Sequence, residues 1–176
     1  NASIAILHPL ITSGALPADW PVSINAISGY SGGGKGMIAA FEDKDASDYT
    51  EEAFRAYGLN LEHKHVPENQ NWSGLTSRPL FVPSVGRYRQ GMIVQVPLQL
   101  NALPEKPSPE DIHTILRDHY AGRACITVAS PEDTAQMSKI DPESLNNTNE
   151  LRLHVFGNAQ HGQAVIIGLL DNLGKG

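Results

Sequence analysis

The pattern of hydrophobic and polar positions in the first half of the chain predicts one helix and three strands. Apolar residues at helical spacing predict a helix over Ser3–Ser13, capped by Gly14 in a left-handed conformation. Val22–Ile27 alternates apolar and polar residues, which is typical of a strand with one buried face. Leu80–Val85 and Gly91–Leu100 are also expected to be strands, and the proline in the second suggests an edge strand or a bulge.

The second half of the chain is predicted to contain one further helix and three further strands. Ser108 is followed by proline and acidic residues, a helix start signal, and the helix should reach about Tyr120 and end at Gly122. Apolar runs then predict three strands over Ala124–Ala129, Glu150–Phe156 and Gln163–Leu170.

Two stretches between these elements are expected to be mostly irregular. Ser28–Gly36 is predicted to be a glycine-rich loop that leads into a short helix over Met37–Phe41. The charged stretch that follows, EDKDASDYTEE, is predicted to be an exposed loop followed by a helix. Several strands adjacent in sequence, roughly six in all with three or four helices, favour an α+β fold with a mixed, largely antiparallel sheet.

Composition and charge restrict the function classes. The chain has 176 residues, enough for a single domain (1–176), and a net charge of −6, which argues against nucleic-acid binding. It has neither a basic amphipathic stretch nor an apolar run of the roughly 18–20 residues that cross a membrane. One cysteine excludes an internal disulfide. We therefore expect a cytoplasmic globular protein, with no membrane or nucleic-acid partner.

The glycine-rich run directly after a predicted strand is the first candidate for chemistry. Its glycines would let backbone N–H groups converge on an anion, with serine and lysine as further donors. Gly29, Gly34 and Lys35 fit the nucleotide-binding phosphate loop, but Gly36 stands where that loop needs Ser or Thr. We predict an anion-binding loop; a flexible surface turn is the alternative.

The second candidate is the segment His63-Lys64-His65-Val66-Pro67-Glu68. Pro67 suits the first position of a helix, so His65 would lie just before a helix N-terminus, well placed for general acid/base catalysis. Histidines at i and i+2 point to opposite sides of a strand or helix, so one site rarely uses both. Two alternatives stay open: solvated surface histidines, or a zinc site that includes Glu68.

The remaining histidines and the cysteine carry no motif. Cys125 falls in the predicted strand RACITVA and is interpreted as a buried small hydrophobe rather than a nucleophile. His8, His113 and His119 fall on predicted helices and are interpreted as packing or surface residues.

Four motifs in order, SGYSGGGKG, EHKHVPEN, FVPSVGRYRQGM and DNLGKG, make the chain resemble the N-acetyl-γ-glutamyl-phosphate reductase family, in its shorter bacterial-type branch. The likeness extends over essentially the whole chain. It implies a C-terminal substrate and dimerisation domain similar to those of glyceraldehyde-phosphate and semialdehyde dehydrogenases, with helices on one face of the sheet. It also implies a homodimer or homotetramer.

The resemblance implies an NADPH-dependent reduction of an acyl phosphate, in which a cysteine thiolate forms a thioester that then receives hydride. The nucleophile segment would precede the first helix, and the NADP-binding Rossmann domain would precede that segment. Both chain ends are interpreted as cut points in a longer fold. The isolated chain is therefore expected to be inactive.

The family motifs also assign site residues, and they imply no metal. His65 would be the acid/base partner of the thiolate. The positions expected to line the substrate and phosphate pocket are Ser28, Gly29, Tyr30, Ser31, Gly32, Lys35, His63 and Glu68. The stretch expected to approach the nicotinamide is Asn172–Gly176, with Asn172, Gly174 and Lys175 as cofactor-binding residues. Two other functions remain open: a nucleotide-binding module built on Gly29–Lys35, and a non-catalytic oligomerisation domain.

Overall fold

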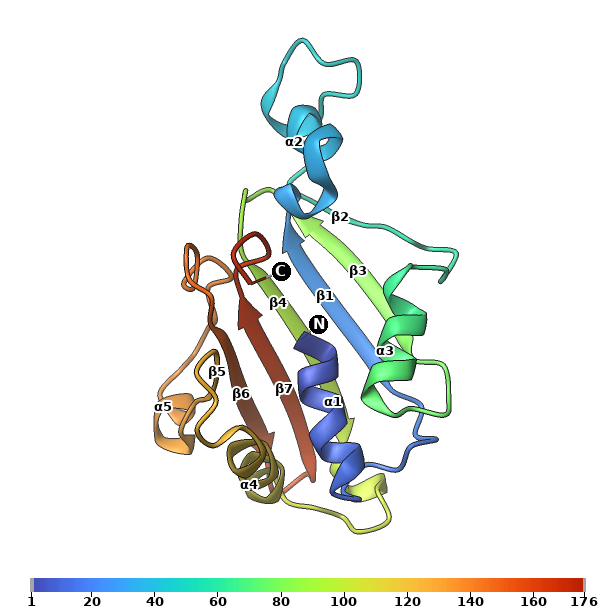
Figure 1. Ribbon diagram of the computed structural model, residues 1–176, viewed down its shortest axis with the longest axis vertical. Helices are drawn as coiled ribbons and strands as arrows, with labels where there is room; N and C mark the ends of the chain where they lie inside the picture. Colours follow the sequence, from blue (N-terminus) through green and yellow to red (C-terminus); the bar gives the residue numbers. More distant parts are fainter. Residues whose placement is uncertain (1, 176) are drawn as a thin grey trace.

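A computed structural model describes residues 2–175, which form one mixed sheet with helices packed against it (Figure 1). The strands are β1 (Ser23–Gly29), β2 (Phe54–Ala56), β3 (Leu80–Gly86), β4 (Met92–Gln99), β5 (Ile126–Val128), β6 (Leu151–Asn158) and β7 (Gln163–Leu170). The α-helices are α1 (Ala2–Thr12), α2 (Gly34–Glu42), α3 (His65–Ser73), α4 (Pro109–Tyr120) and α5 (Pro131–Ala135). Two 3₁₀ turns, η1 (Tyr30–Gly33) and η2 (Leu100–Ala102), follow β1 and β4.

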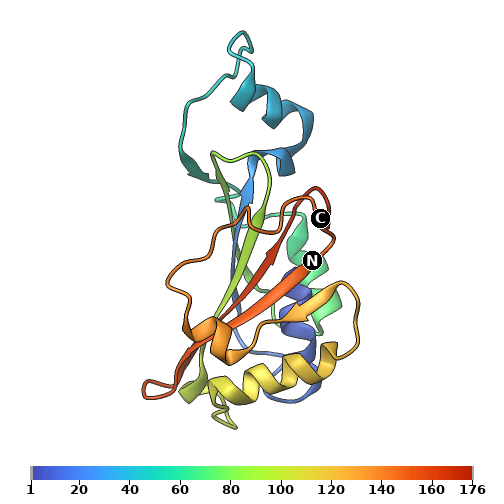
Figure 2. The same cartoon turned by 90° about the vertical axis from the view of Figure 1, so that its left-hand side faces the viewer.

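The strand order is β2-β3-β1-β4-β7-β6-β5. Only β1–β3 and β5–β6 pair in parallel, and the other four neighbours pair antiparallel, so the predicted mixed, largely antiparallel sheet is confirmed. Helices α1, α3 and α4 lie on one face of the sheet, whereas α5 lies beside β6 towards the other (Figures 1 and 2). The predicted α+β class is therefore confirmed.

The core lies between the sheet and the three helices. Alternate residues of the central strands point into it, and Ile24, Val96, Leu153 and Ile166 are fully or almost fully buried there together with the apolar face of α1. This alternation is what the period-2 pattern predicted, because successive strand side chains point to opposite faces.

Helix α1 contains a proline, which removes one backbone donor. Pro9 cannot donate to the carbonyl of Ala5, four residues earlier, and the Tyr120 hydroxyl of α4 donates to that carbonyl at 2.8 Å instead. Gly14 has φ +82°, as expected for the left-handed cap. The first helix is thus confirmed near its predicted bounds and is tied to α4.

The predictions for the strand that contains Pro97 were wrong in one respect. β4 is a central strand, not an edge strand. Its ladder with β1 ends at Gln95, whereas its ladder with β7 continues past Pro97 to Gln99. Pro97 therefore lies beyond the part of β4 that pairs with β1. A missing backbone N–H on that side removes no ladder hydrogen bond.

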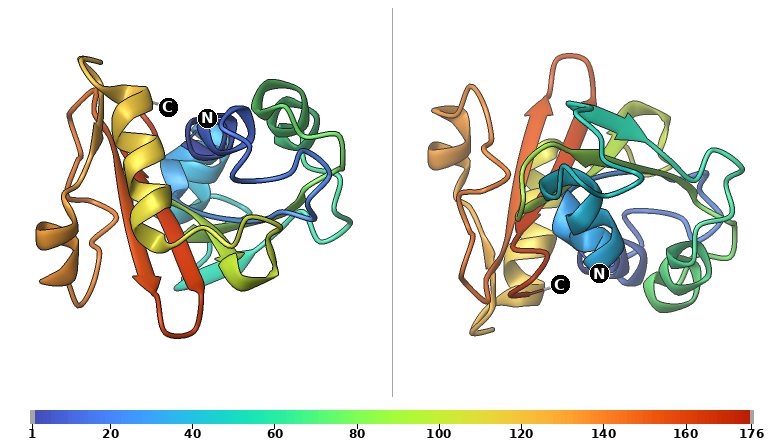
Figure 3. Two further views of the ribbon diagram at one scale, coloured as in Figure 1. Left: turned by 90° about the horizontal axis from the view of Figure 1, so that it is seen from below. Right: turned by 90° about the horizontal axis from the view of Figure 1, so that it is seen from above.

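The segment between β1 and β3 also differs from the prediction. Tyr30–Gly33 is a 3₁₀ turn and α2 begins at Gly34, so most of the predicted glycine-rich loop is helical. The charged stretch after α2 contains no helix and leads into the short strand β2. α2 and this stretch project beyond the end of the sheet (Figures 1 and 2), so that α2 lies in front of the strands when the molecule is seen from above (Figure 3, right).

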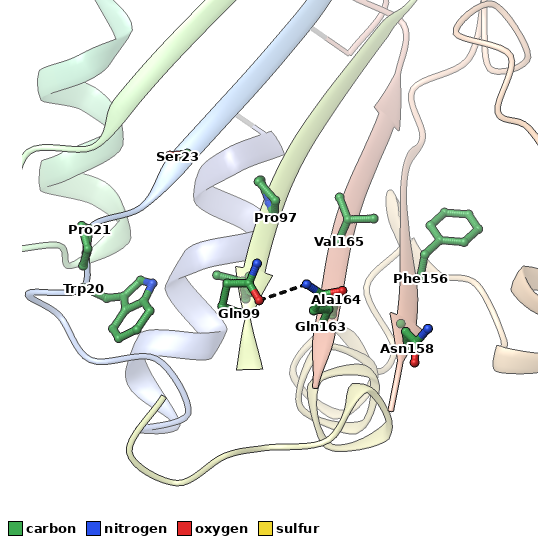
Figure 4. Close-up of a pocket in the computed structure, with 12 residues that line it drawn as sticks. Trp20, Pro21, Ser23, Pro97, Gln99, Phe156, Asn158, Gln163, Ala164 and Val165 are labelled. Carbon is green, nitrogen blue, oxygen red and sulfur yellow. Dashed lines mark hydrogen bonds between the residues drawn. The ribbon is translucent and has the colours of Figure 1, made fainter. Parts of the chain in front are cut away.

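The sheet face away from α1 carries an open groove of about 640 Å³ at the ends of β4, β6 and β7 (Figure 4). Trp20, Pro97, Phe156 and Val165 give it an apolar lining, and the amide of Gln163 donates to that of Gln99 at 3.2 Å within it. Exposed apolar surface of this kind is typical of an interaction face.

Candidate functional site

A cavity of about 560 Å³ lies where the start of α1, the start of α3 and the glycine-rich segment meet over β1, β3 and β4. Eight residues of the two sequence motifs and the C-terminal stretch line it, namely Ser28, Gly32, Gly33, His63, Lys64, His65, Glu68 and Asn172. The fold therefore brings together segments more than 100 residues apart in the chain.

His65 is the first residue of α3. Its Nδ1 lies 2.7 Å from the Glu68 carboxylate, one turn along the helix, and this hydrogen bond lowers the pKa of Glu68. With Nδ1 engaged, Nε2 is the ring nitrogen available to a bound molecule. The expected helix start at Pro67 was wrong by two residues, because the backbone already turns at Lys64, which has helical φ and ψ.

His63 faces the same cavity and contacts His65. The His65 backbone N–H donates to His63 Nδ1 at 3.2 Å, and the His63 ring packs 4.9 Å from the rings of Phe81 and His65. Burial lowers the pKa of His63, and the neighbouring His65 and Lys64 lower it further. His63 is therefore neutral near pH 7 and accepts through Nδ1.

The argument that i and i+2 histidines rarely share a site was wrong here. It assumes a regular strand or helix, but His63 lies in the loop before α3. The zinc alternative gains no support, since no group of three His, Cys, Asp or Glu side chains within residues 2–175 is placed to hold a metal ion.

The glycine-rich segment is packed tightly against the β3–β4 loop. The backbone N–H groups of Gly29, Tyr30 and Ser31 donate to the carbonyls of Gly91, Tyr88 and Arg89 at 2.9 to 3.0 Å. A Cβ at Gly29 would lie 2.7 Å from the Arg89 backbone, so only glycine fits there. Because these three N–H groups already donate to backbone carbonyls, they are not free to bind an anion. The anion-binding loop predicted here is therefore not formed by Gly29, Tyr30 and Ser31.

The side chains of this segment divide between the cavity and α2. Ser28, Gly32 and Gly33 line the cavity. Tyr30 instead stacks on Phe41 at 4.8 Å and donates to Glu42, and Lys35 lies exposed in the first turn of α2. Neither Tyr30 nor Lys35 lines the cavity, so the structure separates them from the residues assigned to the same pocket.

The turn after β7 fixes one more cavity residue. Asn172 accepts from the Gly91 backbone through Oδ1 and donates to Ser31 Oγ through Nδ2. Asp171 beside it is fully buried; burial acts to raise the pKa of its carboxyl, but hydrogen bonds from backbone N–H groups and Gln90 outweigh this and the net shift is downward. Gly174 and Lys175 do not line the cavity, and Gly176 lies outside the described residues.

Cys125 lies apart from this site. It is half-buried just before the short strand β5, and its Sγ is 3.7 Å from Asn149 Nδ2. The predicted strand over Ala124–Ala129 shrinks to Ile126–Val128, so the interpretation of Cys125 as fully buried in a strand was wrong. It does not line the cavity.

Sequence reasoning missed other cavity residues, among them Ser3, Asn69 and Tyr57. Asn69 could have been found from helix periodicity, because it lies four residues after His65 and therefore on the same face of α3. Ser3 belongs to α1 and Tyr57 follows β2, and no sequence signal joins them to the motif.

The family model described as "Semialdehyde dehydrogenase, dimerisation domain" matches residues 1–172. The chain belongs to this family. It is 50% identical, over all 176 residues, to the N-acetyl-gamma-glutamyl-phosphate reductases of Brucella ovis and Brucella canis, and it spans 57% of their length. This match agrees with the motif resemblance, and it covers little more than half of those relatives.

Solved structures agree with the family at the level of fold. A probable aspartate-semialdehyde dehydrogenase from Pseudomonas aeruginosa is similar to 98% of the chain with a TM-score of 0.65 at 14% identity, over 56% of its own length. The aspartate semialdehyde dehydrogenase from Francisella tularensis gives a TM-score of 0.63 at 11% identity, covering 97% of this chain and 58% of its own.

No helix among residues 2–175 is long and apolar enough to cross a membrane.

Proposed function

We propose that this chain is the substrate-side domain of an NADP-dependent reductase that converts N-acetyl-γ-glutamyl phosphate to N-acetylglutamate semialdehyde and phosphate. The observation that carries the proposal is the His65–Glu68 pair at 2.7 Å in a cavity built from the family's motifs, in a chain 50% identical to reductases of that name. The nucleotide-binding domain and the thiolate would lie outside these 176 residues, so the isolated chain would not turn over.

In this proposal His65 is the acid/base residue. Glu68 holds Nδ1–H, and Nε2 exchanges a proton with the reacting sulfur or oxygen. A thiolate outside these residues would displace phosphate from the acyl phosphate to give a thioester, and bound NADPH would supply the hydride. The thiolate would leave again as the semialdehyde forms. His63, held neutral, contributes a second ring to the cavity wall without adding charge.

Within this proposal, Asn172 would be the cavity residue that approaches the nicotinamide. Its Oδ1 and one Nδ2 hydrogen are used by Gly91 and Ser31, which fixes the amide plane and leaves one N–H for a carboxamide acceptor. Gly174 and Lys175 are exposed or packed away from the cavity, so support for cofactor binding rests on Asn172.

The test uses the full-length protein in the reverse direction, with NADP⁺, N-acetylglutamate semialdehyde and inorganic phosphate. We expect phosphate-dependent NADPH formation, and we expect His65→Ala to lower kcat by about 10²- to 10⁴-fold with an unchanged thermal midpoint. His161→Ala, which alters an exposed histidine of the β6–β7 turn outside the cavity, serves as the matched control. A folded protein without phosphate-dependent turnover would contradict the proposal.

We also propose that the full-length protein is a homo-oligomer, at least a dimer, assembled through the sheet face that carries the groove of Trp20, Pro97, Phe156 and Val165. The family's description as a dimerisation domain supports this, as does the apolar lining of an open sheet face.

A further inference from the structure

Two buried polar side chains from different helices meet inside the His65 cavity. Ser3 of α1 and Asn69 of α3 are only 5% and 3% exposed, and both line the cavity. The Ser3 hydroxyl donates to Asn69 Oδ1 at 2.5 Å, a bond between residues 66 apart in the chain. The pair therefore forms only when α1 packs against α3.

This bond determines which end of the Asn69 amide is used. With Oδ1 engaged by Ser3, the amide can act in the cavity only through Nδ2, a donor. Nδ2 donates to no side chain or carbonyl in residues 2–175. Because Asn69 lines the cavity, a molecule bound there can accept a hydrogen bond from Nδ2.

Asn69 is also correctly placed relative to His65. The two residues are four apart on α3, so both point from the same face of the helix into the cavity, about 5–6 Å apart at Cβ. A molecule that exchanges a proton with His65 Nε2 would therefore occupy the same cavity as Asn69. The cavity, at about 560 Å³, is in the range of small-molecule sites.

The chemistry of the pair selects the kind of atom it binds. An uncharged N–H donor that is held in place suits a carbonyl oxygen. It supplies no positive charge to offset that of a carboxylate or phosphate, which arginine or lysine bind more strongly. We propose that Asn69 is a substrate-binding residue that donates to a carbonyl oxygen of the substrate, and that Ser3 positions its amide. This inference rests on the proposed function, in which the substrate carries two carbonyls, the reacting one and that of its acetamido group.

The experiment compares Asn69→Asp with wild type in the full-length protein, in the assay with N-acetylglutamate semialdehyde. Aspartate keeps an oxygen for Ser3 but replaces the donor by an oxygen, so the bond to the substrate becomes a repulsion. We expect KM to rise about tenfold or more. Ser3→Ala, which frees the amide without removing it, should raise KM less.

Asn71→Asp is the matched control, because Asn71 lies exposed on the same helix outside the cavity and receives the same charge change. Its KM should equal that of wild type. If Asn69→Asp lowers the thermal midpoint so far that it is not folded in the assay, Asn69→Ala removes the donor without adding charge and is expected to raise KM about tenfold.

The division between KM and kcat identifies the oxygen. A rise in KM at constant kcat indicates the acetamido carbonyl, since that bond is equal in ground and transition states, whereas a fall in kcat indicates the reacting carbonyl. Unchanged kinetics in both folded Asn69 variants, with an active wild type, would overturn the inference about Asn69. An inactive wild type would instead overturn the proposed function.

Discussion

At the scale of single residues, the seven histidines of the chain have very different surroundings. His154 on β6 is 3% exposed, lies on the sheet face towards α5, and has no hydrogen-bond partner for either ring nitrogen within residues 2–175. It stacks on Phe156 at 5.9 Å. His113 is buried too, but its Nε2 lies 2.9 Å from the Ala129 carbonyl.

The isolation of His154 makes the fold sensitive to acid. Burial lowers the pKa of His154 and Arg152 lowers it further, while Asp133 and Glu150 oppose this. The unfolded chain, with an ordinary histidine pKa near 6.5, then binds the proton more readily. The stability contributed by neutral His154 is thus fully present above about pH 6.5 and is lost as the pH falls below it.

We therefore expect the full-length protein to lose thermal stability between about pH 7.5 and about pH 5.5, and His154→Leu to lose about 2–4 °C less. The measurement is the thermal midpoint at both pH values. His161→Leu, at an exposed histidine of the β6–β7 turn, is the control and should match wild type. An equal loss in His154→Leu and wild type would show that this histidine does not limit acid stability.

Residue chemistry alone singled out His65 as a candidate, because a histidine beside a predicted helix start is suited to proton transfer, and His65 does line the cavity. It did not single out Asn69, whose proposed role depends on where Ser3 of α1 packs. The family resemblance grouped Tyr30 and Lys35 with the pocket, but both lie outside it.

At the scale of elements, the helices and strands with local signals were predicted well. Ser108 and Asp111 form a capping box at the start of α4, with Pro109 at its first position, and Gly122 follows the helix with φ +75°. These signals act over a few residues and do not depend on packing. By contrast, β2 has three residues and pairs only with β3, so its sequence carries almost no periodicity.

The capping box is expected to contribute measurably to stability. Ser108→Ala removes the hydroxyl that accepts from the Asp111 backbone at 3.1 Å, and should lower the free energy of unfolding by about 1 kcal/mol. Chemical denaturation of the full-length protein checks this. Ser77→Ala, at a half-buried serine with no side-chain hydrogen bond among the described residues, should change it much less.

At the scale of the whole molecule, one sheet separates the two proposed functions. The face towards α1 and α3 carries the His65 cavity, and the opposite face carries the groove of Figure 4. A substitution in the groove should therefore change self-association without changing the cavity, and this tests the proposed oligomer directly.

Val165→Glu places a charge in the groove and should weaken self-association of the full-length protein at least tenfold, because a buried unpaired carboxylate is costly. Light scattering across a concentration series measures the shift towards monomer. Ser47→Glu, in the exposed stretch after α2, adds the same charge away from the sheet and should leave the mass unchanged. A variant at Val165 with the wild-type mass would place the interface elsewhere.

The sequence by itself determined the α+β class, most strands and the capped helices, and it singled out the His65 motif as a candidate site. Each of these depends on alternation of apolar residues, on caps or on side-chain chemistry, which are local properties. Only the tertiary structure decided that His63 and His65 share a cavity, that the amides of Gly29–Ser31 are used by the β3–β4 loop, and that Ser3 orients Asn69. These contacts join residues far apart in the chain, and their geometry depends on how the helices pack on the sheet.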